Sequence, residues 1–150
     1  MRLNEDIEIE DKVAGIMALY EGAGLDVNSG IIPTAAQWKA LLQAPKKGKI
    51  YLISVFVFKT DPVAYMGEDV LKVYDQIDRE LGSKFFFSGP IHGTFTGDEE
   101  AVQWKDFNIK EFPSLEAAIR FITDPRIIEF QKKRPGLIEK QRTIIVTSED

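Results

Sequence analysis

The sequence predicts an α+β fold of the ferredoxin-like kind, an antiparallel sheet with helices on one face. From residue 49 onward, strand and helix patterns follow one another in the order β-α-β-β-α-β. The residues before this segment show only helical periodicity. We therefore expect an N-terminal helical extension over residues 1–48 and a ferredoxin-like domain over residues 49–150.

Two helices are expected in the extension. The first covers residues 8–22, where apolar side chains recur at helical spacing at Ile9, Val13, Ile16, Met17 and Tyr20. The second begins after Thr34, which serves as N-cap, and Gln37 three residues later completes a capping box. Pro45 ends this second helix.

The segment KIYLISVFVFK, residues 49–59, reads as a strand that is apolar on both faces. Asp61 and Pro62 then begin a single long helix that ends at Gly82. Apolar residues follow along it in steps of three and four.

The second half of the domain contains three further strands. Residues 84–97 form the first, with a bulge or an edge expected near Ser88, Gly89 and Pro90, because proline cannot donate to a ladder. Residues 102–112 form the next, and residues 142–147 form the last. Between these last two, Pro113-Ser114 and Asp124-Pro125 begin two helices.

Helices cover only one face of such a sheet, so the other face of the strand at residues 49–59 needs a cover. A second copy of the chain is the simplest candidate, because most oligomers are symmetric homodimers. The N-terminal helices are the alternative cover, within one chain. We expect the homodimer.

Three stretches resemble the uncharacterised families of the dimeric α+β barrel superfamily. They are IIPTAAQWKALLQAPKKGKIYLISVFVFK, WKDFNIKEFPSLEAAIRFITDP and KKRPGLIEKQRTIIV, within about residues 31–148. The resemblance implies ferredoxin-like subunits whose sheets pair face to face as a dimeric barrel. Active members of the superfamily include cofactor-independent monooxygenases and isomerases, which hold substrate between the sheet and its helices. Arg134 keeps the family's pattern, whereas Ser54 replaces an asparagine.

The composition excludes several classes of function. The net charge of −5 opposes nucleic-acid binding, which needs clustered Lys and Arg. No apolar run approaches the ~20 residues of a membrane-spanning helix. The acidic N-terminus lacks the apolar segment of a signal peptide. We therefore expect a cytoplasmic protein with neither nucleic acid nor membrane as partner.

His92 is the only histidine of the chain and lies in the stretch FFFSGPIHGTFTG. With an ordinary pKa near 6.5, a histidine can act as general base toward an activated C–H or O–H group. The alternative is a turn residue beside Pro90 and Gly93. No G-x-S-x-G motif supports a hydrolase triad. His92 is thus the candidate catalytic residue, with the structural role left open.

A polar stripe marks a candidate binding site. Trp104, Asp106, Asn108 and Lys110 share one face of a strand by period two. Such a stripe faces solvent in many sheets, but in a face-to-face dimer it would lie at the interface or a pocket and need partners. The predicted ligand-binding residues are Ser54, Trp104, Asp106, Asn108 and Arg134.

No metal or cofactor is expected. One histidine and no cysteine leave no set of transition-metal ligands. Asp98, Glu99 and Glu100 are consecutive and lack the spacing of a calcium loop. No G-x-G-x-x-G loop follows a strand.

Three functions remain open. The first is binding of a small apolar molecule by a homodimeric barrel, which the aromatic content favours. The second is a cofactor-independent oxygenase or isomerase, with His92 as base and Arg134 or Asn108 orienting the substrate. The third is a structural or interaction module without ligand, which a filled interior would favour.

Overall fold

The computed structural model describes residues 2–98 and 103–148. Within them one four-stranded sheet forms the centre of the fold. Its strands are β1 (Ile50–Phe58), β2 (Lys84–Pro90), β3 (Asp106–Phe112) and β4 (Ile138–Thr147). The spatial order is β2-β3-β1-β4, and every neighbouring pair is antiparallel. The ferredoxin-like α+β prediction is confirmed, and the sheet of the single chain is open.

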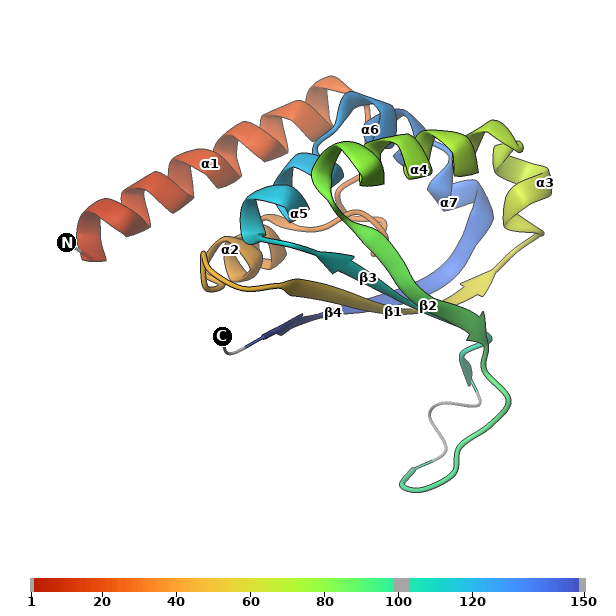
Figure 1. The fold of residues 1–150 in the computed structure, drawn as a ribbon. Coiled ribbons are helices and arrows are strands. Elements are labelled where there is room, and N and C mark those ends of the chain that lie inside the picture. The colour runs from red at the N-terminus through yellow and green to blue at the C-terminus, as the bar shows by residue number, and fades with distance from the viewer. Residues whose placement is uncertain (1, 99–102, 149–150) are drawn as a thin grey trace.

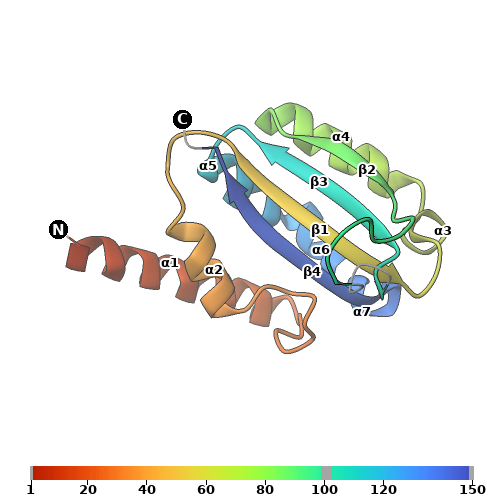
Figure 2. The same ribbon diagram turned by 90° about the horizontal axis from the view of Figure 1, so that it is seen from below.

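The helices lie on one side of this sheet (Figures 1 and 2). They are α1 (Arg2–Gly22), α2 (Ala35–Leu42), α3 (Pro62–Met66), α4 (Asp69–Leu81), α5 (Leu115–Ile122), α6 (Pro125–Gln131) and α7 (Arg134–Leu137). Figure 2, seen from below, shows the other face of the sheet without a helix over it. No helix in the described ranges has the length and apolar character that a membrane span requires.

Local sequence signals set most helix starts. The Thr34 hydroxyl accepts from the Gln37 amide at 3.2 Å, and the Gln37 side chain accepts from the Thr34 amide at 2.9 Å. This is the predicted capping box of α2. Asp61 and Asp124 cap α3 and α6, each followed by proline at the first helical position.

The expected long helix between Pro62 and Gly82 is wrong, because the chain breaks into α3 and α4. Gly67 ends α3 with φ of 93°, a backbone conformation that residues with a Cβ rarely adopt. Gly82 ends α4 with φ of 73°, as expected from its position after the apolar periodicity.

The strand that carries FFFSGP is shorter than predicted and ends at Pro90. It lies at an edge of the sheet, as expected for a strand with proline. Of the two alternatives expected near Pro90, a bulge or an edge, the structure shows the edge, and the register shift lies earlier, between Phe85 and Phe87. The next strand begins at Asp106 rather than Val102, which itself lies outside the described residues.

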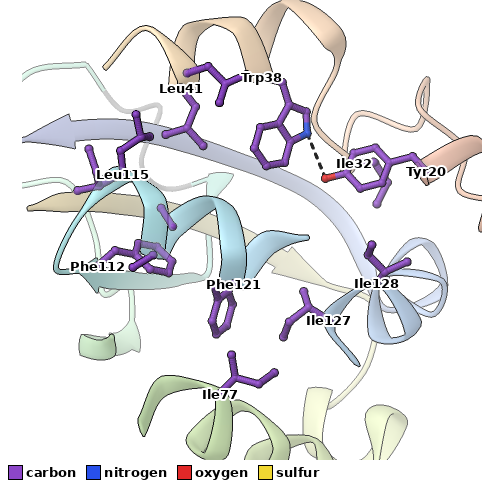
Figure 3. Packing of buried hydrophobic residues seen from close by; sticks show 14 of the residues in the cluster. Tyr20, Ile32, Trp38, Leu41, Ile77, Phe112, Leu115, Phe121, Ile127 and Ile128 are labelled. Atoms are coloured by element: carbon purple, nitrogen blue, oxygen red, sulfur yellow. Dashed lines mark hydrogen bonds between the residues drawn. The ribbon is translucent and has the colours of Figure 1, made fainter. Parts of the chain in front are cut away.

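The N-terminal helices share the main core with the domain (Figure 3). Trp38 of α2 is 1 % exposed, and its indole N–H donates to the hydroxyl of fully buried Tyr20 of α1 at 3.1 Å. Ile127 and Ile128 of α6 belong to the same cluster. The extension therefore packs on the helical side, and the alternative in which it covers the other face is wrong. The division at residue 48 stays a prediction.

The face of the sheet without helices is apolar. Phe87, Ile109, Ile53 and Ile144 pair across the four strands and form one row on this face. Phe87 is 59 % exposed and Ile144 52 % exposed. A single chain thus leaves large apolar side chains in contact with water.

Candidate functional site: a cavity between the sheet and its helices

A cavity of about 740 Å³ lies between the covered face of the sheet and the helices α2, α3, α4, α5, α6 and α7. The period of two along the strands determines which residues reach it. Leu52, Ser54 and Phe56 of β1 alternate onto this side, as do Asn108 and Lys110 of β3. The volume falls in the range of about 300–1,000 Å³ that small-molecule sites occupy.

Most of the wall is apolar and aromatic. Its larger apolar side chains come from the sheet and from the helices around it, and they include Trp38, Leu41, Phe56, Phe58, Met66 and Phe121. Phe56 and Phe58 stack with ring centroids 5.1 Å apart. Such a wall binds hydrocarbon or aromatic groups by removing them from water.

A hydrogen-bonded row of polar side chains runs along one part of this wall. The Ser54 and Thr143 hydroxyls lie 2.7 Å apart, and Gln141 donates to Thr143 at 3.0 Å. Arg134 donates through Nη2 to the Gln141 side-chain oxygen at 2.7 Å. The register creates this row, because Ser54 pairs with Thr143, and Phe56 pairs with Gln141.

Arg134 also hydrogen-bonds the Tyr74 hydroxyl. The Tyr74 ring packs edge-on against Phe130 at 5.6 Å between centroids. Burial raises the pKa of Tyr74, and the positive charge of Arg134 partly offsets this rise. Burial also lowers the pKa of Arg134, with Tyr74 opposing. Arg134 is half-buried, and its guanidinium stays charged in proteins.

Lys110 supplies a second cation to the cavity wall. Its ammonium pairs with the Asp78 carboxylate, which also accepts from Ser83 at 2.6 Å. The same ammonium lies 4.0 Å from the ring centroid of Phe85 and 4.3 Å from that of Phe121, so two cation–π contacts accompany the ion pair. Burial lowers the pKa of Lys110, with Asp78 partly opposing.

Three of the residues predicted to bind ligand, Ser54, Asn108 and Arg134, line the cavity together. Trp104 and Asp106 do not belong to its wall. Trp104 is 9 % exposed and lies beneath the side chains of Lys140 and Arg142, and Asp106 is the first residue of β3. The shared face predicted from period two holds for Asn108 and Lys110.

His92 lies in the segment between β2 and β3 and is exposed. It is not among the residues that line the cavity. Its catalytic role stays a prediction, and this position in a single chain gives that role no support.

Sequence reasoning missed several polar groups of the cavity, among them Gln131, Gln141 and Thr143. Alternation along the last strand places Gln141 and Thr143 on one face. If Thr143 is known to pair with Ser54, this face is the one that lines the cavity. Gln131, the last residue of α6, is one polar residue at the end of a short helix and gives no signal of its own.

No protein-family model and no curated protein matches the chain. Solved structures, however, do match this chain. A protein of unknown function from Rhodopseudomonas palustris is 22% identical, with a TM-score of 0.64 over 80% of this chain and 97% of that one. The hydroxynitrile lyase of Passiflora edulis is 15% identical, with a TM-score of 0.52 over 71% and 97%.

SnoaB, a cofactor-independent oxygenase from Streptomyces nogalater, is 14% identical, with a TM-score of 0.45 over 69% of this chain and 95% of that one. A likeness of that size is too loose to bear on function. At identities of 22% and 15%, the two better matches show a shared fold and nothing more.

Proposed function

We propose that this protein binds a small, largely apolar molecule in the cavity between its sheet and its helices. The observation that carries the proposal is a cavity of about 740 Å³ with an aromatic and aliphatic wall. The cavity is partly open to solvent, so a small molecule can enter it, and its apolar wall would gain by contact with such a molecule in place of water.

The polar groups of the cavity support binding of a defined molecule. Binding sites combine an apolar wall with a small number of placed polar groups that orient the ligand. Here those groups are the row from Ser54 to Arg134 and the amide of Asn108. An apolar body would contact the wall, and these groups would orient it.

We further propose that the protein works as a homodimer, paired through the open face of the sheet. The row of Phe87, Ile109, Ile53 and Ile144 crosses all four strands of this face. A second copy placed face to face would remove these side chains from water. A cofactor-independent oxygenase or isomerase with His92 as base is the alternative function. It requires His92 to reach a bound molecule, although this residue is exposed and lies outside the cavity wall.

The test of binding is fluorescence titration with N-phenyl-1-naphthylamine, a neutral apolar dye that brightens away from water. We expect saturable binding to the wild-type protein. Leu41 is buried beside the cavity, so the larger side chain of Leu41→Trp should fill part of the cavity. This variant should bind the dye about tenfold more weakly, or weaker still. Leu19→Trp is the matched control on an exposed position of α1. Absent binding, or equal binding to both variants, would overturn the proposal.

A further inference from the structure

Arg134 brings a positive charge to the cavity wall that no carboxylate neutralises within residues 2–98 and 103–148. Its hydrogen-bond partners in these ranges are the side-chain oxygen of Gln141 and the hydroxyl of Tyr74. Both are neutral. A guanidinium has five N–H donors, so these partners leave part of its donor capacity unused as well as its charge.

The contrast with Lys110 shows that this chain can supply a counter-charge. Lys110 lines the same cavity, and its ammonium is paired with Asp78 and enclosed by aromatic rings. Arg134 is half-buried, so its charge is only partly solvated, and taking a charge out of water is costly unless the charge is paired. Arg134 lacks such a partner, and its charge faces a space that can admit one.

The chemistry of these groups indicates the class of ligand. A guanidinium binds a carboxylate through two parallel N–H···O bonds, and this charge-assisted pair is about twice as strong as a neutral one. The rest of the wall, with Trp38, Leu41 and Phe56, suits an apolar body. We propose that the ligand is an apolar monocarboxylic acid whose carboxylate pairs with Arg134, an inference that rests on the proposed binding function.

The test compares two probes of nearly the same shape at pH 7.5, 2-naphthoate and its neutral amide 2-naphthamide. The carboxylate is fully ionised at this pH, since carboxyl groups have ordinary pKa values near 4. Titration calorimetry on the wild-type protein should give a preference for 2-naphthoate of about tenfold or more, the size that a charge-assisted hydrogen bond contributes. Equal affinities would overturn the inference.

Arg134→Met should abolish this preference and leave the affinity for 2-naphthamide unchanged. Lys132→Met is the matched control, because it removes one positive charge from an exposed side chain two residues away. The control should keep the preference, and a preference that survives in Arg134→Met contradicts the inference. If Arg134→Met does not fold, Arg134→Lys decides: this variant keeps the charge but loses the planar fork, so its preference must fall.

The dye titration separates the two proposals. If N-phenyl-1-naphthylamine binds and neither naphthyl probe does, or both do equally, the cavity binds apolar molecules and the acid-specific inference is wrong. If the dye and both naphthyl probes all fail to bind the wild-type protein, the proposed binding function is itself wrong.

Discussion

Lys110 of β3 and Asp78 of α4 form an ion pair in the interior, where their side chains are 6% and 12% exposed. The pair joins the sheet to the helix that covers it. Breaking such a pair by removing one partner leaves an uncompensated buried charge.

We therefore expect Asp78→Ala to lower the free energy of unfolding by about 3–5 kcal/mol. The double variant Asp78→Leu, Lys110→Met should recover most of this loss, because apolar residues of similar volume replace a buried ion pair at little cost. Urea denaturation measures both. Arg79→Ala, which breaks the exposed pair with Asp75, is the control and should leave stability nearly unchanged. A double variant as unstable as Asp78→Ala would contradict this account.

The contribution of Tyr20 to the stability of the fold is lost at alkaline pH. Burial raises its pKa from the ordinary value of 10.0 to about 12, with the Trp38 hydrogen bond partly opposing. Between pH 10 and 12 the unfolded chain loses the phenolic proton and the folded chain keeps it. The folded state then binds more protons, so the contribution of Tyr20 to stability falls as pH rises, by up to about 1.4 kcal/mol per pH unit.

Tyr20→Phe tests this relation in two ways. At pH 7 it leaves the buried indole N–H of Trp38 without its acceptor, at a cost of about 1–3 kcal/mol. Above pH 10 the difference between wild type and variant should shrink steadily. Denaturation curves between pH 7 and 11.5 measure both effects, and using the difference cancels the titration of Tyr74 and Lys110. A difference that does not change with pH would refute the assignment to Tyr20.

Two glycines should respond to alanine with opposite signs. Gly82 ends α4 with φ of 73°, and a Cβ there meets Pro113 at an ordinary 3.7 Å. The cost of Gly82→Ala is therefore one of backbone strain, about 1 kcal/mol. Gly15 lies within α1 with open space around it, so Gly15→Ala should stabilise by about 0.5–1 kcal/mol. Thermal unfolding compares the two, and equal shifts would argue against these conformations.

The open face of the sheet makes the oligomeric state testable. Light scattering at micromolar concentration should give the mass of a dimer for the wild type. Ile144→Lys places a charge in the apolar row and should give a monomer, whereas Leu19→Lys, at an exposed site on α1, should not change the mass. A wild-type monomer at this concentration would refute the dimer.

Short-range signals in the sequence determined the parts of the fold that were predicted correctly. The capping box of Thr34 and Gln37 spans four residues, and alternation along the strands placed Ser54 and Asn108 on the cavity side. The break at Gly67 was missed because Val63, Met66 and Val70 continue the helical steps across it. A glycine inside such a pattern is compatible with an unbroken helix.

The polar end of the cavity depends on contacts between distant segments. Arg134 meets Gln141 because α7 leads directly into β4, and Gln141 meets Thr143 along that strand. Tyr74 reaches Arg134 from a helix sixty positions earlier in the chain. These contacts follow from register and from the turn between α6 and α7, which local sequence patterns do not encode.

The row from Arg134 to Ser54 has a fixed direction of hydrogen-bond donation. Arginine only donates, so the Gln141 oxygen accepts from it and the Gln141 amide donates to Thr143. One hydrogen bond joins the Thr143 and Ser54 hydroxyls, and the two hydroxyls have one hydrogen each. Whichever hydroxyl donates to the other, one hydrogen is left over. This part of the wall therefore always has a spare O–H donor, ready for an acceptor oxygen of whatever molecule occupies the cavity.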